Sequence, residues 1–379
     1  MLSVFCSPSR YIQGKNATAV LGTEMFGMGL NGPALIVASR SPIRLLSETW
    51  KHTLGEAGIS YAVHEFCGEC SMAEIERIKQ IAKQHKSQVI IGAGGGKVLD
   101  AARAVAADLS LPIVNCPTVA SSDSPCSALS VIYSDDGIAL RSQFHRKNAD
   151  LVLVDTQLIA QSPPRLLVAG MGDALATWFE AKTCADGGIK NLRGGLSTQA
   201  ALTLAKLCYR TLLADGADAL RSVHSKVVTP ALERLVEANT LLSGLGFESS
   251  GLAAAHAVHN GLTTAKGTHA YLHGEKVAFG LLTQLVLEGQ PRAVLHRVLG
   301  FATEVGLPIT LAEIGLTDVS KEVLQKIAVR ATAENDTMHN EPFEVKPDMV
   351  ADAIMAADAT GRAWKNDDRS SSPDSRMKR

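Results

Sequence analysis

Short apolar runs alternate with amphipathic helical segments in the first half of the chain, and this alternation constrains the fold most. Ala34–Ala38 is a continuous run of β-forming residues, typical of a strand buried on both faces. Further strands are expected at residues 61–66, 89–91, 112–116, 130–133 and 151–154, with helices at 42–57, 71–82 and 98–109 and a turn at 135–137. Parallel strands need crossover helices of this kind, so the sequence predicts a parallel, doubly wound sheet.

The pattern changes at Ser162-Pro163-Pro164, where a serine N-cap and a proline in the first turn predict the start of a helix. Almost no strand signal follows. Helices are expected at 163–182, 196–213, 228–245, 251–263, 275–288, 291–305, 320–333 and 347–365. The fold class is therefore α/β plus all-α, with a boundary near residue 162. The polar, serine-rich stretch 366–379 is expected to be a disordered tail.

Composition narrows the class of function. The net charge of −1 gives no electrostatic footprint for nucleic acid or for an anionic membrane. No apolar run is long enough for a transmembrane helix, and no signal peptide is apparent, so neither membrane nor nucleic-acid partners are expected. The seven scattered cysteines indicate free thiols in a reducing compartment, hence the cytoplasm. Cys67 and Cys70 form a C-x-x-C pair, either an incidental pair of thiols or a redox motif.

Four histidines, His256, His259, His269 and His273, lie within the stretch 248–280 among small and apolar residues. A single buried histidine is usually a satisfied core residue, but four together favour a metal site. Asp173 opens an apolar helical run and is either a helix cap or a further ligand. Two histidines and one carboxylate would leave a position open for substrate, and this ligand type suits zinc and non-haem iron alike.

A glycine-rich turn at residues 92–100 follows a predicted strand and opens a predicted helix. Glycines let the backbone approach an anion, and the free amides of the helix N-terminus favour phosphate. The dinucleotide pattern G-x-G-x-x-G fails, because Lys97 takes the last glycine position, so a plain tight turn stays an alternative. Lys97 and Asp100 suggest ribose or phosphate contacts. The next loop, 117–127, places the carboxylate of Asp123 at the same edge of the sheet.

Five motifs occur in a fixed order along nearly the whole chain: GGGK-x-x-D at 94–100, PTVASSDSPCSALSVIY at 117–133, GDALATWFEA at 172–181, GLAAAHAVHNGL at 251–262 and HGEKVAFG at 273–280. With them the chain resembles the glycerol dehydrogenase branch of the metal-dependent, iron-containing (group III) alcohol dehydrogenase superfamily. The resemblance implies a dehydroquinate synthase-like architecture. Residues 1–162 would form a Rossmann-like nicotinamide cofactor-binding domain and residues 163–365 a helical metal- and substrate-binding domain.

The resemblance also implies the site. One Zn²⁺ per subunit would be held by Asp173, His256 and His273, which with Asp123 would bind substrate and carry the chemistry. The residues expected to contact NAD are Ser39, Gly94, Gly95, Gly96, Lys97, Asp100, Thr118, Ser121, Ser127, Leu129 and Tyr133. His259 and His269 match no ligand of the family and are assigned either to support of the metal ligands or to core packing.

Two positions discriminate within the superfamily. Iron-using relatives carry a histidine four residues after the aspartate ligand, where this chain has Thr177, which favours zinc. NAD-preferring members of the branch place an aspartate after the first strand, where this chain has Ser39 followed by Arg40. A carboxylate there repels a 2′-phosphate, whereas serine and arginine accept one. NAD stays the expected cofactor because the rest of the chain follows that branch, with NADP as the alternative.

The activity implied is oxidation of glycerol to dihydroxyacetone with hydride transfer to NAD. The main alternative is a related metal-dependent reductase of another vicinal diol or hydroxyketone. More distant alternatives are a dehydroquinate synthase-like lyase and a non-catalytic binding protein, and the intact set of Asp173, His256 and His273 argues against the latter. The resemblance further implies a ring-like homo-oligomer such as an octamer.

Overall fold

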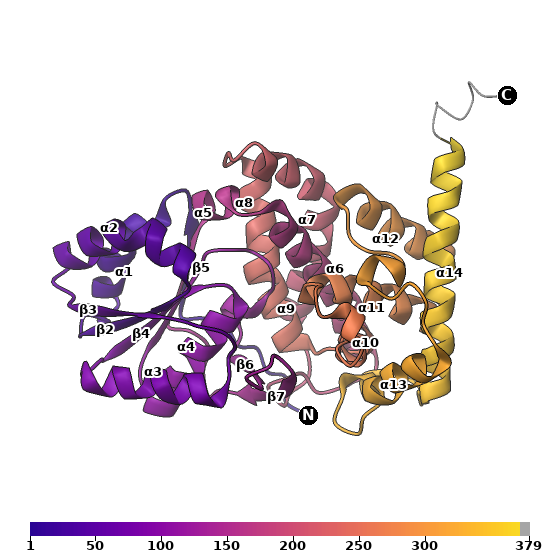
Figure 1. The fold of residues 1–379 in the computed structure, drawn as a ribbon, viewed down its shortest axis with the longest axis horizontal. Coiled ribbons are helices and arrows are strands. Elements are labelled where there is room, and N and C mark those ends of the chain that lie inside the picture. The colour runs from indigo at the N-terminus through magenta and orange to yellow at the C-terminus, as the bar shows by residue number, and fades with distance from the viewer. Residues whose placement is uncertain (372–379) are drawn as a thin grey trace.

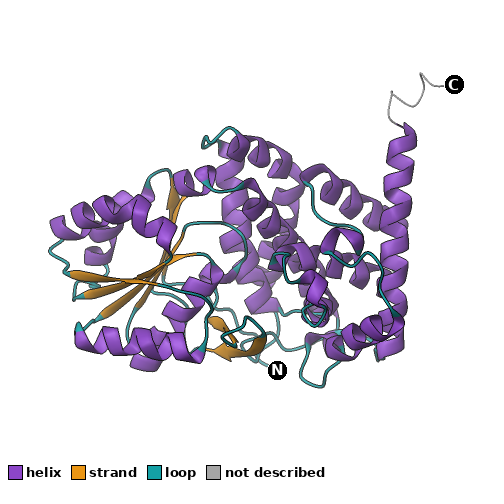
Figure 2. Cartoon of the chain, viewed as in Figure 1, coloured by secondary structure: helices purple, strands orange, loops and turns teal. Residues whose placement is uncertain are grey.

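A parallel sheet forms the N-terminal part of the molecule, and helices form the rest (Figure 2). The computed structural model describes residues 1–371 of the chain. Its six-stranded sheet has the order β1-β8-β5-β4-β2-β3, with every neighbouring pair parallel. The strands are β1 (Arg10–Gly14), β2 (Ala34–Ala38), β3 (Tyr61–Glu65), β4 (Val89–Gly94), β5 (Ile113–Pro117) and β8 (Leu151–Asp155). The predicted parallel sheet is confirmed.

Three strands depart from the prediction. β6 (Leu129–Tyr133) was expected but lies outside the parallel sheet, paired antiparallel with β7 (Ala139–Phe144) through the predicted turn at Gly137. Neither β7 nor the edge strand β1 was predicted. Both carry exposed or half-buried residues along most of their length, so neither has the apolar run that marks a buried strand.

Helices cover both faces of the sheet (Figure 1). Successive residues of a strand point to opposite faces. Leu35 joins the core under α3 (Met72–Gln84) and α4 (Gly96–Leu109), while Ile36 packs with Trp50 under α1 (Leu21–Gly27) and α2 (Arg40–Glu56). Ser71 caps the N-terminus of α3, since its Oγ accepts the Glu74 amide, whereas the Glu74 side chain turns to His64.

The strand order reverses between β2 and β4. β3 lies outside β2, and the chain then returns to place β4 on the other side of β2. The helices that follow, α2 and α4, lie on opposite faces of the sheet. Beyond the carboxyl ends of two such strands an α/β sheet leaves a crevice that binds ligands. Ser39 and Gly95 are the residues directly after β2 and β4, so both stand at this crevice.

After β8 the described residues up to 371 contain no further strand. The helices are α5 (Thr156–Gln161), α6 (Pro164–Asp186), α7 (Gln199–His224), α8 (Pro230–Glu237), α9 (Ser243–Ser250), α10 (Ala254–Leu262), α11 (His273–Leu287), α12 (Arg292–Val305), α13 (Lys321–Ala331) and α14 (Pro347–Ser371). A π-helical turn, Ala238–Leu242, joins α8 to α9. The core on the α4 side of the sheet continues without interruption into these helices. The division into two domains at residue 162 stays a prediction.

Two details at helix ends differ from expectation. Ser162 ends α5 by donating from Oγ to the Ile159 carbonyl at 2.8 Å, and Pro163 rather than Ser162 stands before α6. α14 runs on to Ser371, although a disordered tail was expected from residue 366. Its apolar residues pack into the core as far as Trp364, and extending an existing helix costs far less than starting one. The rest of the predicted tail, 372–379, lies outside the described residues.

Among the described residues, no helix combines the length and the hydropathy that crossing a bilayer requires.

Candidate metal centre and active site

Three helices bring Asp173, His256 and His273 together. Asp173 lies in the middle of α6, His256 in the first turn of α10, and His273 is the first residue of α11. Their ligand atoms all lie within 4.8 Å of one another. Asp173 Oδ1 is 3.1 Å from His273 Nε2 and 3.4 Å from His256 Nε2. The three residues that the resemblance named therefore form one cluster.

Glycines beside two of these residues explain how α6 and α11 come so close. A Cβ atom added to Gly172 would lie 2.3 Å from the Gly274 carbonyl oxygen, and one added to Gly274 would lie 1.8 Å from the Ala169 carbonyl oxygen. No side chain fits at either position without moving a backbone. The sequence pairs Gly172-Asp173 and His273-Gly274 thus each join a candidate ligand to the residue that lets its helix approach.

The environment of Asp173 fits a cation. Its side chain is 0% exposed, and its position inside α6 rules out the role of helix cap. Although both imidazoles are near, neither contact has hydrogen-bond geometry, and Oδ1 is a buried oxygen without a donor. Burial raises the pKa of Asp173, but the charges of His273 and His256 outweigh it and the pKa is lowered. A carboxylate and two imidazole nitrogens facing one point suit Zn²⁺.

The cluster has one open side. The side chains of Asp173 and His256 are 0% and 11% exposed, whereas that of His273 is 41% exposed. A substrate would therefore approach from the His273 side. Thr177, one turn after Asp173, is fully buried, and its side chain has neither a nitrogen nor a carboxylate to contribute as a ligand.

Glu180 fixes the orientation of His256. It lies two turns after Asp173 on the same face of α6 and its side chain is 0% exposed. Glu180 Oε2 is 2.7 Å from His256 Nδ1, and Oε1 accepts the amides of Ala253 and His256 at 2.8 and 3.0 Å. A carboxylate at Nδ1 holds a proton there, so that a metal ion would be bound through Nε2, the ring nitrogen that faces Asp173. Burial lowers the pKa of His256, but Glu180 and Asp173 outweigh this and raise it.

The first turn of α10 is fixed on all its amides. Besides the two bonds to Glu180, the Ala254 amide donates to Glu341 Oε1 at 3.1 Å and the Ala255 amide to Gln284 Oε1 at 2.9 Å. Side chains from α6, α11 and the segment before α14 thus replace the missing helical partners. His256 is held by its backbone as well as by its ring.

His259 and His269, for which the prediction left support of the ligands or core packing open, differ in their surroundings. His259 is buried, with Nε2 3.0 Å from His273 Nδ1 and Nδ1 3.2 Å from Asn260 Oδ1. Burial and the neighbouring His273 lower the pKa of His259. His259 therefore supports the His273 ring in the way that Glu180 supports His256. His269 is exposed, with Nε2 3.0 Å from the Thr263 carbonyl oxygen, and takes no part in the cluster.

Asp123 connects the sheet to this cluster. It lies in the loop after β5, and its amide donates to Asp173 Oδ2 at 3.2 Å. Its Oδ2 accepts from Ser243 Oγ at 3.0 Å. Burial, and then the charge of Asp173, raise the pKa of Asp123 well above its ordinary range. The predicted loop carboxylate therefore lies directly beside the candidate metal ligands.

Several predicted cofactor residues share the crevice between β2 and β4. Gly94, Gly95, Gly96 and Lys97 form the β4–α4 turn, and the Thr118 amide donates to the Gly94 carbonyl at 3.1 Å. No side chain caps the N-terminus of α4, which leaves its first amides to an anion. Ser121 is half-buried in the loop that follows Thr118.

Charged side chains flank the crevice. Lys97 Nζ is 2.6 Å from Glu69 Oε1 and 5.4 Å from the centre of the Tyr133 ring. On the other side is Arg40, which directly follows Ser39 in the sequence. Its Nε is 2.9 Å from Glu65 Oε1. Both bases thus have a carboxylate partner that a phosphate would have to displace.

Three other predicted cofactor residues have protein partners instead. Asp100 is buried and accepts from Arg103 at 2.9 Å, from Ser124 at 3.0 Å and from the Val131 amide at 2.9 Å. Ser127 Oγ donates to the Ser124 carbonyl, and the Leu129 carbonyl accepts from Arg103. Arg103, which sequence reasoning missed, is 1% exposed. These bonds fix the loop that carries Asp123 to α4.

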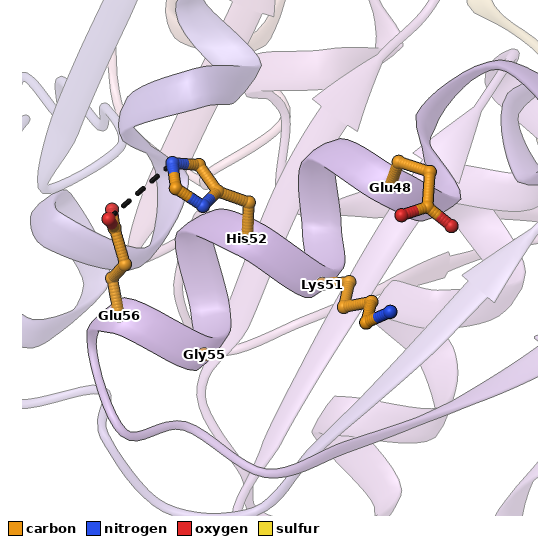
Figure 3. Close-up of a pocket in the computed structure, with 5 residues that line it drawn as sticks. All are labelled: Glu48, Lys51, His52, Gly55 and Glu56. Atoms are coloured by element: carbon orange, nitrogen blue, oxygen red, sulfur yellow. Dashed lines mark ion pairs between the residues drawn. The ribbon is translucent and has the colours of Figure 1, made fainter.

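Two other features carry no candidate chemistry. The shallow surface pocket in Figure 3 is lined by Glu48, Lys51, His52, Gly55 and Glu56 of α2, on its solvent side. In the C-x-x-C pair, Cys67 is exposed but Cys70 is fully buried, and burial raises the pKa of its thiol. A buried, protonated thiol is a poor redox nucleophile, which favours the interpretation as an incidental pair.

Comparison with known proteins identifies the family of the chain. The family described as iron-containing alcohol dehydrogenase matches residues 8–156. A glycerol dehydrogenase of Thermotoga maritima is 50% identical over 366 residues, 97% of this chain and 100% of its own length. A glycolaldehyde reductase of Halobacterium salinarum is 47% identical, covering 96% of this chain and 99% of its own. The crystal structure of glycerol dehydrogenase from Schizosaccharomyces pombe superposes with a TM-score of 0.93 at 36% identity, over 98% of this chain and 94% of that one.

The chain belongs to the iron-containing alcohol dehydrogenase family. Within that family its near full-length relatives include several glycerol dehydrogenases, and the chain is an oxidoreductase. The predicted family and enzyme class are confirmed.

Proposed function

We propose that this protein is a zinc-dependent polyol dehydrogenase that oxidises glycerol to dihydroxyacetone with NAD. The observation that carries the proposal is the position of Asp123. Its carboxylate stands beside the cluster of Asp173, His256 and His273, to which its own amide is bonded. One group of residues could thus hold a metal while a neighbouring carboxylate binds a second hydroxyl of the same substrate. Relatives named glycerol dehydrogenase support the same substrate class.

Zinc is proposed over iron because of the number of protein ligands. Asp173, His256 and His273 offer one ligand atom each, and Thr177 stands where the resemblance places a fourth ligand in iron enzymes. When bound, the metal would supply Lewis acidity that lowers the pKa of a substrate hydroxyl. NAD, when bound, would supply the hydride acceptor.

The chain's own residues orient the metal ligands, the substrate and the cofactor. Glu180 and His259 fix the rings of His256 and His273, so that both Nε2 atoms face one point. Asp123 accepts a hydrogen bond from a further hydroxyl and so favours polyols over simple alcohols. The crevice between β2 and β4 would hold the dinucleotide, with its phosphates at the uncapped N-terminus of α4.

NAD is proposed over NADP, against the signal of Ser39 and Arg40. The structure adds one relevant contact, since Arg40 is paired with Glu65 at the end of β3. A 2′-phosphate that binds Arg40 would first have to displace Glu65 from it, and this disfavours NADP. The predicted homo-oligomer and the predicted cytoplasmic location stay predictions.

The experiment that tests the function is a panel of substrates against both cofactors. Glycerol, 1,2-propanediol and 1-propanol are assayed with NAD and NADP, and dihydroxyacetone and glycolaldehyde with the reduced forms. The proposal expects the highest kcat/KM for the glycerol and dihydroxyacetone pair with NAD. Glycolaldehyde is included because one relative, 47% identical to this chain, is named glycolaldehyde reductase. A higher kcat/KM for glycolaldehyde than for dihydroxyacetone would contradict the proposed substrate.

Replacement of Asp123 by alanine is expected to raise KM for glycerol about tenfold or more, the size of one lost hydrogen bond. The KM for 1-propanol, which has no second hydroxyl, should change much less. Steady-state kinetics of both alcohols on the same preparation measure this difference. Asp136→Ala, at an exposed turn, is the matched control. Equal changes for the two alcohols would remove the proposed role of Asp123.

A further inference from the structure

A buried hydroxyl pair stands behind Asp123. Ser243 Oγ donates to Asp123 Oδ2 at 3.0 Å, and Thr177 Oγ1 lies 2.7 Å from Ser243 Oγ. A serine hydroxyl has one proton, which is used on the carboxylate, so Thr177 donates to Ser243. Thr177 and Ser243 are both 0% exposed. The pair is therefore a fixed chain of hydrogen bonds, Thr177 to Ser243 to Asp123, closed to water.

These hydrogen bonds leave one carboxylate oxygen of Asp123 for a ligand. Within residues 1–371, Oδ2 accepts from Ser243 and no protein donor bonds to Oδ1. The Asp123 amide is bonded to Asp173 Oδ2 at 3.2 Å, so the backbone of Asp123 is fixed to one residue of α6. Its side chain is fixed, through Ser243, to Thr177 one turn further along the same helix. The backbone and the side chain of Asp123 are thus both held in place relative to Asp173.

The local backbone is built to bring Ser243 to this position. The π-helical turn Ala238–Leu242 directly precedes Ser243, and such turns are frequent at functional sites. A Cβ atom added to Gly244 would lie 2.9 Å from the Asp123 carbonyl oxygen, and one added to Gly246 would lie 2.8 Å from Thr177 Cγ2. The helix can approach both the loop and α6 only because these two residues have no side chain.

We infer that Thr177 and Ser243 are positioning residues that aim the Asp123 carboxylate at a second hydroxyl of the substrate and so set the preference for polyols. The inference rests on the proposed function, because it needs Asp123 to bind that hydroxyl. It also gives Thr177 a role of its own. At the position where a fourth ligand stands in iron enzymes, this chain would have a residue that determines substrate specificity.

The test uses three variants of the full-length, zinc-loaded enzyme, a pair at Thr177 and one at Ser243. Thr177→Val keeps the shape and removes the hydroxyl, whereas Thr177→Ser removes a methyl group and keeps the hydroxyl. Ser243→Ala removes the second hydroxyl. The measured quantity is the ratio of kcat/KM for glycerol to kcat/KM for 1-propanol, together with zinc content and melting temperature.

We expect Thr177→Val and Ser243→Ala each to lower this ratio about tenfold, which corresponds to the net free energy of one hydrogen bond. Thr177→Ser should keep the ratio within about threefold of wild type, because it keeps the hydroxyl although it loses a buried methyl group. With a merely structural role, the ratio would follow the melting temperatures of the variants rather than the presence of the hydroxyl. Combining Ser243→Ala with Asp123→Ala should add little to the effect of Asp123→Ala alone, because the chain acts through that carboxylate.

The outcomes separate the two proposals. A wild-type enzyme without preference for glycerol over 1-propanol contradicts the proposed function. A wild-type enzyme with that preference, unchanged in Thr177→Val and Ser243→Ala, overturns the inference and leaves the function standing. Should Ser243→Ala fail to fold, the Thr177→Val and Thr177→Ser pair decides alone.

Discussion

Asp173→Asn is expected to lower kcat/KM for glycerol by about 10³-fold or more, since a catalytic metal supplies several kcal/mol to the transition state. The substitution keeps the shape of the side chain but removes the charge that faces His256 and His273. It also replaces one carboxylate oxygen with an amide group that donates rather than accepts. Metal content of the purified variant, measured beside its activity, checks the cause, because both should fall together.

Asp186→Asn is the matched control for this variant. Asp186 ends the same helix, and its exposed side chain is paired with Lys182. It should keep both metal and activity near wild type, as surface ion pairs contribute little. An Asp173→Asn variant that retains full metal content and full activity would exclude Asp173 as a ligand.

Glu180→Gln is expected to weaken zinc binding by about 10- to 100-fold, the usual effect of losing a partner behind a metal ligand. The reason lies in the hydrogen bonds of Glu180. Oε1 accepts two backbone amides, so the oxygen of a glutamine must stay there. The amide NH₂ would then face His256 Nδ1 and donate to it, which moves the ring proton to Nε2. That tautomer has no lone pair for the metal.

Glu341→Gln separates this effect from simple capping. Glu341 accepts the Ala254 amide in the same turn of α10 but does not contact the His256 ring. Zinc affinity, measured by competition with a chromophoric chelator, should drop in Glu180→Gln and change little in Glu341→Gln. Equal losses in the two variants would mean that Glu180 acts only as a helix cap.

Sequence reasoning located the sheet and most helices because their physical signals are local. Ala34–Ala38 lies between two neighbouring strands, so its whole length is apolar and visible as a run. β7 has no such run, because nearly all of its residues are exposed. The end of α14 is set by continuation of a helix already anchored in the core, which the polar residues after Trp364 do not reveal.

The site was predicted unevenly for a related reason. The family motifs named Asp173, His256 and His273, and the structure brings all three together. They did not separate Asp100, whose carboxylate is used by Arg103 and Ser124, from residues left free for a ligand. That distinction depends on contacts between segments far apart in sequence.

The supporting residues were missed for the same cause. Glu180 has a weak local signal, since it repeats the position of Asp173 two turns later on α6. Ser243 has none, because only the π-helical turn and the two following glycine contacts bring it to Asp123. Such partners follow from tertiary structure rather than from the spacing of a motif.

The dependence of activity on zinc is tested most directly by removing and restoring the metal in the wild-type enzyme. Zinc and iron are quantified per subunit before chelation, after chelation, and after each ion is added back, with glycerol oxidation by NAD measured at every stage. We expect about one zinc per subunit, loss of activity with its removal, and recovery with zinc in proportion to the metal bound. Undiminished glycerol oxidation by a metal-free preparation would contradict this dependence.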